Sequence, residues 1–126
     1  MLDCMLTLLR HSDGNAIAFR AHELLTDADY QDVLIPSVEK MLESHASVRV
    51  LLDCDEDFRG WEPRALWDDA KFGVQHRDQF EKMALVGGSL MAQWGIKVAN
   101  HLTKAEMRTF EEGEFEKAWG WLTSDV

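Results

Sequence analysis

The stretch Val48–Pro63, VRVLLDCDEDFRGWEP, decides the fold of this chain. The run VRVLL at 48–52 is apolar and rich in β-favouring residues, which predicts a buried strand over Val48–Asp53. Acidic residues, an Arg-Gly pair and a Trp follow before a helical pattern begins. Because ligands and partners meet open α/β sheets at the carboxyl ends of such strands, Asp53–Trp61 is the first place to look for function.

Length and charge set limits on what this chain can be. At 126 residues we expect a single domain over 1–126 that needs no cofactor or disulfide to fold. The formal net charge of −10 argues against nucleic-acid partners and anionic membranes. No apolar run approaches the roughly 20 residues that cross a bilayer. The N-terminal MLDCMLTLLRHSDG has neither a basic leader nor a cleavage site, so we expect a cytoplasmic protein without membrane insertion.

The segments before the central strand predict a hairpin and a helix. Leu6–His11 and Ala16–His22 are β-like runs separated by the turn residues SDGN, and Thr26 with Asp29 forms a weak capping box. The helix that starts there should end near Ser44, with a kink or a separate first turn at Pro36. Its buried face should carry Leu34, Val38, Met41 and Leu42.

The segments after the central strand alternate between helix and strand. The spacing predicts a helix from Trp61, with Pro63 in its first turn, to about His76. The residues spaced for its buried face are Leu66, Ala70, Gly73 and Val74.

The remaining segments complete the predicted sheet and its covering helices. In chain order we expect a strand at Lys82–Gly88, a helix at Ser89–His101, a strand at Met107–Glu111 and a final helix. The inward residues of the final helix are Phe115, Ala118, Trp119 and Leu122. The prediction is therefore an α/β fold: a mixed, mostly parallel sheet of about five strands with about four covering helices.

The chain resembles the SpoIIAA-like proteins, which are related in fold to anti-sigma factor antagonists and other STAS domains. The likeness is carried by the opening hairpin, TDADY, LLDCDEDFRGWEPRALWDDAKFGVQH, KMALVGG and FEEGEFEKAWGWL in that order. It implies a mixed sheet of about five strands, likeness to lipid-carrying CRAL-TRIO folds, and a biochemical role that is not settled. Anti-sigma factor antagonists carry a phosphorylatable Ser or Thr after the central strand. Asp53–Gly60 has no hydroxyl residue, so their regulatory chemistry does not carry over.

The motifs that could carry catalysis have simpler interpretations. Asp53 and Asp55 match the DxD of haloacid-dehalogenase phosphatases only briefly, and a solvated acidic loop is favoured over a phosphatase or a metal site. A tight turn explains the glycines before Ser89 better than an anion site does. Cys4 and Cys54 have no CxxC spacing and are expected to be buried free thiols. The five histidines form no i,i+4 pair and have no nearby nucleophile, so we assign none of them to catalysis. Taken together, these motifs predict no enzyme, catalytic residue, cofactor or metal.

Aromatic residues give the strongest functional signal. The chain has five Trp, and Trp119 and Trp121 lie about 200° apart on a helix, so at least one should be near the surface. Exposed aromatic area often marks a binding site. We therefore expect a non-enzymatic module that binds a protein partner or a second copy of itself, forming a homodimer.

The alternative is a carrier or sensor of a small apolar or amphipathic, lipid-like ligand. Trp61 and Trp67 are expected to point in opposite directions on one helix, which leaves one of them free to line a cleft. Arg59 at the mouth would bind an acidic head group, although its pairing with Asp57 or Glu56 would instead order the loop. The candidate site for a ligand or partner is thus Asp57, Arg59, Trp61 and Trp67.

Overall fold

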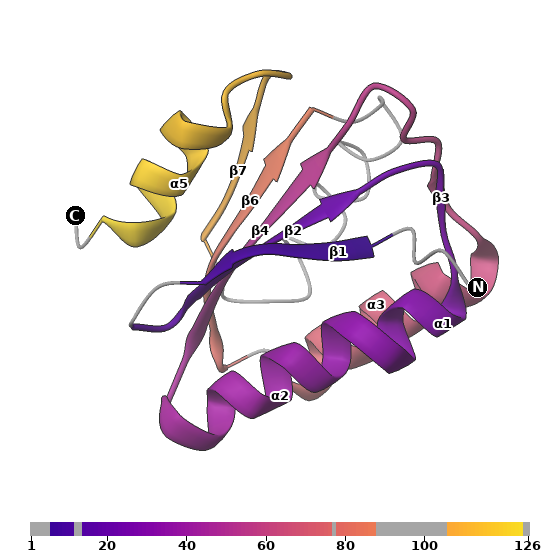
Figure 1. Cartoon of the computed structure of the whole chain (residues 1–126). Coiled ribbons are helices and arrows are strands. Elements are labelled where there is room, and N and C mark those ends of the chain that lie inside the picture. The colour runs from indigo at the N-terminus through magenta and orange to yellow at the C-terminus, as the bar shows by residue number, and fades with distance from the viewer. Residues whose placement is uncertain (1–5, 12–13, 77, 88–105, 125–126) are drawn as a thin grey trace.

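A five-stranded sheet forms the centre of the protein (Figure 1). The computed structural model describes residues 6–11, 14–76, 78–87 and 106–124. The strands lie in the order β1-β2-β4-β6-β7; the first pair is antiparallel and the others are parallel, which confirms the predicted fold class. Their bounds are Leu6–His11 (β1), Ala16–Ala21 (β2), Val48–Cys54 (β4), Phe80–Val86 (β6) and Glu106–Phe110 (β7).

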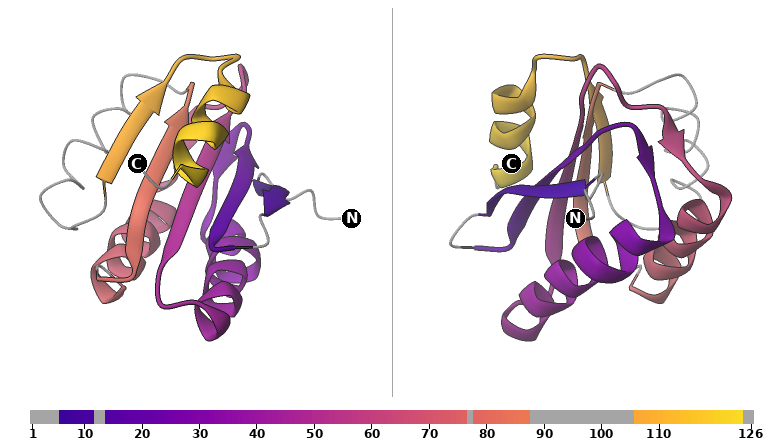
Figure 2. Two further views of the ribbon diagram at one scale, coloured as in Figure 1. Left: turned by 90° about the vertical axis from the view of Figure 1, so that its left-hand side faces the viewer. Right: turned by 45° about the vertical axis from the view of Figure 1, so that its right-hand side comes forward.

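Helices cover both faces of the sheet. One helical path joins α1 (Asp27–Asp29), the π-helical turn η1 (Tyr30–Leu34) and α2 (Ile35–Ser44). The other described helices are α3 (Pro63–Gln75) and α5 (Phe115–Thr123). The predicted helix at Ser89–His101 lies outside the described residues. Figure 2 shows α5 on one side of the sheet and α1 to α3 on the other.

The alternation of side chains along each strand divides the core into two layers. Phe19, Val50 and Leu85 point toward α2 and α3, where they pack with Tyr30 and Phe72. The opposite face packs under α5, and its buried residues are smaller on average: Ala16, Ala18, Leu51, Ala84, Val86, Phe110, Ala118 and Leu122.

The start of the first helical path follows the sequence signals closely. The Thr26 hydroxyl accepts a hydrogen bond from the Asp29 N–H, and the Asp29 carboxylate accepts one from the Thr26 N–H, so the capping box is confirmed. Pro36 lies in the first turn of α2, directly after the π-helical turn. A proline ring crowds the carbonyl four residues earlier, and a wider π turn relieves that crowding without ending the helix.

Two cations of the sheet hold the carboxyl end of α5. The buried Lys82 Nζ donates to the carbonyls of Trp121 (3.0 Å) and Ser124 (2.8 Å). The Arg49 guanidinium donates to the carbonyls of Leu122 (3.0 Å) and Ser124 (2.8 Å). The last carbonyls of a helix have no intrahelical donors and carry partial negative charge, so these contacts fix α5 to β4 and β6.

A glycine lets the ends of β4 and β6 approach each other. Gly87 has a φ of +70°, and its N–H donates a 2.8 Å hydrogen bond to the carbonyl of Phe110. A Cβ atom at this position would lie 2.7 Å from the Cys54 carbonyl oxygen. Only glycine fits this backbone conformation and this distance.

Candidate partner-binding surface

Hydrogen bonds of backbone N–H groups, more than ion pairs, order the loop after β4. Asp53 is buried and pairs with Arg20 at 3.1 Å. Asp57 and Arg59 are both exposed; the Asp57 N–H donates to Asp55 Oδ1 (2.9 Å) and the Arg59 N–H to the Glu23 carbonyl (2.6 Å). Within the described part of the chain the Arg59 side chain forms no ion pair with Asp57. The two predicted residues therefore lie close in the loop without pairing.

Trp61 does not lie on the helix that was predicted to contain it. It belongs to β5 (Gly60–Trp61), which pairs in parallel with β3 (Leu24–Leu25), and α3 begins only at Pro63. The Trp61 indole packs edge-on against Phe58, with ring centroids 5.3 Å apart. It is half-buried against the core. The prediction of a helix from Trp61 is wrong because a pairing with a distant segment extends the chain there.

A chain of polar contacts connects Trp61 to α3 beneath the surface. The Trp61 indole N–H donates to the Tyr30 hydroxyl (2.8 Å), and that hydroxyl donates to Asp69 Oδ1 (2.9 Å). Burial and then the nearby Asp69 carboxyl raise the pKa of Tyr30 well above its usual value. Burial also raises the pKa of Asp69, and the hydrogen bond from Tyr30 opposes that shift. These groups satisfy one another and hold α3 in place.

The face of α3 that the sequence predicted to be buried points to solvent instead. Leu66, Ala70 and Val74 are exposed, whereas Ala65 and Phe72 face the core. At about 100° per residue, five exposed apolar residues fall within an arc of about 100°. We call them the outer stripe: Pro63, Leu66, Trp67, Ala70 and Val74.

Trp67 is the most exposed large side chain of the outer stripe. Its relative exposure is 66%, compared with 51% for Leu66 and 45% for Val74. Arg64 and Lys71 are exposed along one flank of the stripe. Of the four predicted site residues, only Trp67 therefore belongs to this surface. The sequence did contain a signal for this surface: the spacing of Leu66, Ala70 and Val74 was detected, but it was assigned to the buried face of the helix.

The aromatic residues of α5 are covered by cations. Trp119 stacks on Phe115 (6.4 Å between ring centroids), and the Arg10 guanidinium lies 5.4 Å from the Trp119 ring centroid. The Lys82 ammonium lies 4.9 Å from the ring centroid of Trp121. Both tryptophans are half-buried. Neither matches the exposure of Trp67, so α5 is the weaker candidate for a binding surface.

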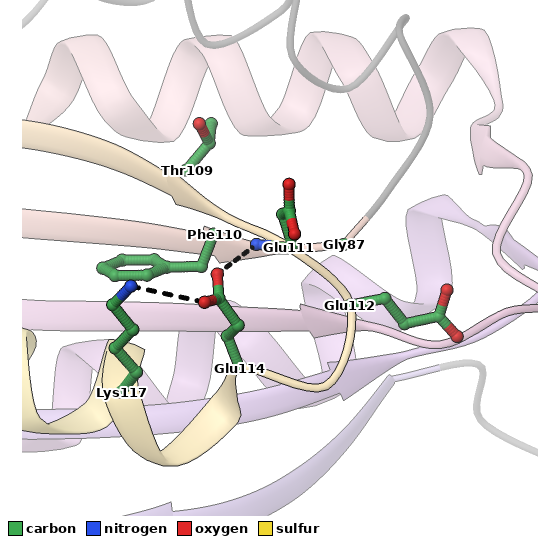
Figure 3. A pocket seen from close by; sticks show the side chains of 7 residues that line it. All are labelled: Gly87, Thr109, Phe110, Glu111, Glu112, Glu114 and Lys117. Atoms are coloured by element: carbon green, nitrogen blue, oxygen red, sulfur yellow. Dashed lines mark hydrogen bonds and ion pairs between the residues drawn. The ribbon is translucent and has the colours of Figure 1, made fainter.

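A pocket of about 720 Å³ lies at the carboxyl ends of β6 and β7 (Figure 3). Glu114 accepts hydrogen bonds from the Glu111 N–H (2.8 Å) and from Lys117 Nζ (3.3 Å), and these lower its pKa. The pocket contains none of the predicted site residues; it is lined by Gly87, Thr109, Phe110, Glu111, Glu112, Glu114 and Lys117. Its three carboxylates disfavour an acidic head group.

The described residues offer few other groups that could bind a metal ion or react. Within the described ranges, no three His, Cys, Asp or Glu side chains are grouped to hold a metal ion. Cys54 is a buried free thiol, and burial followed by the charges of Asp53 and Asp55 raises its pKa to about 12. Cys4 lies outside the described residues. No helix in the described ranges is long and apolar enough to cross a membrane.

The sheet order and the helices on both faces define a mixed α/β domain of the SpoIIAA-like fold. The SpoIIAA-like family profile matches residues 16–123, so the chain belongs to the SpoIIAA-like family. It is similar to an uncharacterized DUF3478-family protein with a SpoIIAA-like fold from Shewanella loihica PV-4. The two share 30% sequence identity and a TM-score of 0.68, over 93% of this chain and 91% of that one. No curated protein matches the chain.

Proposed function

We propose that this protein is a non-enzymatic binding module that associates with a second copy of itself through the outer stripe of α3. The observation that carries the proposal is the exposure of Leu66, Trp67 and Val74 on one side of a helix whose other side is fixed to the core. Large apolar side chains gathered in this way lose contact with water on association. Aromatic residues at the centre of such a patch commonly contribute most of the binding energy.

Charge supports this location for the contact. Each copy carries a formal net charge of −10, so two copies repel each other over most of their surfaces. The outer stripe contains no ionisable side chain, so it can be buried without desolvating a charge. Because salt screens the repulsion between copies, association through this surface should strengthen as ionic strength rises.

The mass of the protein in solution tests the proposal. Light scattering should give twice the chain mass of 14.4 kDa at micromolar concentration, and Trp67→Lys should give the monomer mass. Leu8→Lys is a matched control, because Leu8 is an exposed apolar residue (44%) on β1, away from α3. It should leave the dimer intact. A monomeric wild-type protein, or a Trp67→Lys variant that still dimerises, would refute the proposal.

We do not propose the lipid-like ligand as a second function. That alternative needed one tryptophan to line a cleft beside Arg59. Trp61 is packed against Phe58 and bonded to Tyr30, and Trp67 lies on the open side of α3. The pocket at the carboxyl ends of β6 and β7 lies elsewhere and is acidic.

A further inference from the structure

Two carboxyl groups meet where α1 contacts α3. Asp27 is the first residue of α1, and Asp68 lies on α3 with 8% of its surface exposed. Arg64, one helical turn before Asp68 on α3, pairs with Asp27, so Asp68 lies beside Asp27, and that carboxyl raises the pKa of Asp68. Asp27 Oδ1 and Asp68 Oδ2 are both shielded from solvent, and neither accepts a hydrogen bond from the described residues. Two ionised carboxylates could not remain together in this way without a large electrostatic cost.

The surrounding groups decide how the charge is distributed. From α3, Arg64 Nε lies 3.7 Å from Asp27 Oδ1, and its charge also opposes the rise in the pKa of Asp68. The Gln31 side chain on η1 lies near Asp68 and opposes the rise in its pKa. Glu62, just before α3, accepts a 3.0 Å hydrogen bond from the Asp27 N–H and adds negative charge nearby. Arg64 pairs with Asp27, and no described cation forms an ion pair with Asp68, so the proton is retained most easily on Asp68.

We propose that Asp27 and Asp68 share one proton, with Asp68 donating to Asp27, and that this proton is a pH-sensitive clasp between α1 and α3. The shared proton accounts for the missing hydrogen bonds of Asp27 Oδ1 and Asp68 Oδ2, because it forms a hydrogen bond between the two carboxyls. The direction of the Asp68 pKa agrees: contact with Asp27 raises it, and burial adds to the shift. The clasp is formed by other residues than those of the outer stripe, so it does not rest on the proposed self-association.

The sign of the pH effect follows from the raised pKa of Asp68. Below the ordinary pKa of an aspartate, the carboxyl is protonated in both the folded and the unfolded protein. Between that value and the raised folded pKa, the folded protein binds more protons, so stability falls as pH rises. The clasp is therefore closed in acid and opens as pH rises through the folded pKa. Because it acts on α3, pH sets how firmly the helix with the outer stripe is held.

Replacing the Asp68 carboxyl by an amide tests the clasp. Asp68→Asn supplies a permanent donor, so its melting temperature relative to wild type should rise by about 3 °C between pH 4 and pH 7.5. Asp32→Asn is the matched control, since Asp32 is an exposed acid on η1. Its difference from wild type should stay nearly constant over the same range. Parallel pH profiles for wild type and Asp68→Asn would overturn the proposal.

A carboxyl titration of the unmodified protein supports the same test if the variant folds poorly. In ¹³C NMR spectra, the Asp27 and Asp68 carboxyls should titrate as a coupled pair, with one apparent pKa above the ordinary value of about 3.9. Titration of both carboxyls at or below that value would contradict the clasp. So would stabilisation by millimolar Mg²⁺ or Ca²⁺ at pH 7 that Asp68→Asn abolishes, because a cation would then be the missing partner.

Discussion

The indole N–H of Trp61 lies 2.8 Å from the hydroxyl oxygen of Tyr30 and donates a hydrogen bond to it. The Tyr30 hydroxyl in turn donates a hydrogen bond to Asp69 of α3. A short strand, a π-helical turn and a helix are therefore joined by one chain of hydrogen bonds. The outer stripe lies on the other side of that helix. The surface that we propose for self-association is therefore presented by a helix whose inner side is held by directional bonds.

Removing the Tyr30 hydroxyl should weaken this joint. Tyr30→Phe leaves the Trp61 indole without an acceptor and Asp69 without a donor, so we expect a loss of about 1–3 kcal/mol of unfolding free energy. Urea denaturation measures it. In a double-mutant cycle with Trp61→Phe, the two losses should be clearly less than additive. Additive losses would show that the bond contributes nothing of its own.

Two glycine substitutions should have opposite signs. Gly87→Ala places a Cβ 2.7 Å from the Cys54 carbonyl oxygen at a φ of +70°, so it should destabilise by more than about 1 kcal/mol. Gly73→Ala lies inside α3 with open space around it, so it should stabilise by about 0.5–1 kcal/mol. Thermal melts of the two variants give the comparison. Equal effects would mean that the tight approach at Gly87 is not retained in solution.

The buried ammonium under α5 should be needed for the packing of that helix. Lys82→Met keeps much of the side-chain volume but leaves the Trp121 and Ser124 carbonyls without this donor, at a cost of about 1–3 kcal/mol. Lys117→Met is the control because its side chain is 67% exposed. It should change stability little. If the two variants unfold at the same denaturant concentration, the Lys82 contacts do not stabilise α5.

The Cys54 thiol should be almost inert in the folded protein. Its pKa of about 12 keeps it protonated at pH 8, and the thiolate is the reactive form. In a Cys4→Ser background, a thiol reagent should therefore modify Cys54 only as fast as the protein unfolds. Added urea should accelerate the reaction. Rapid modification without denaturant would show that the end of β4 opens locally.

Local signals in the sequence were sufficient for most of the elements. The capping box at Thr26 and Asp29 begins a helix in the structure, because it satisfies backbone donors within three residues. Val48–Asp53 was predicted as the central strand, and β4 extends one residue further to Cys54. These patterns depend on near neighbours and on the period of side chains along the chain. They need no knowledge of the tertiary contacts.

The errors arose where distant segments decide the outcome. The extended backbone at Trp61 depends on pairing with Leu25, and the sequence around Trp61 gives no sign of that pairing. Periodicity detected the shared spacing of Leu66, Ala70 and Val74, but it could not show which side of the helix the core would cover. The core side instead contains Asp69, which looks like a surface residue until its bond with Tyr30 is known.

The placement of α5 has a consequence for synthesis on the ribosome. The five strands of the central sheet precede Phe115–Thr123 in the chain, yet the described residues that cover the sheet face around Leu51 and Val86 come from that helix. A nascent chain that has already formed its strands would still expose this apolar face. It would be prone to contact other chains or chaperones until α5 has left the exit tunnel and packed on this face.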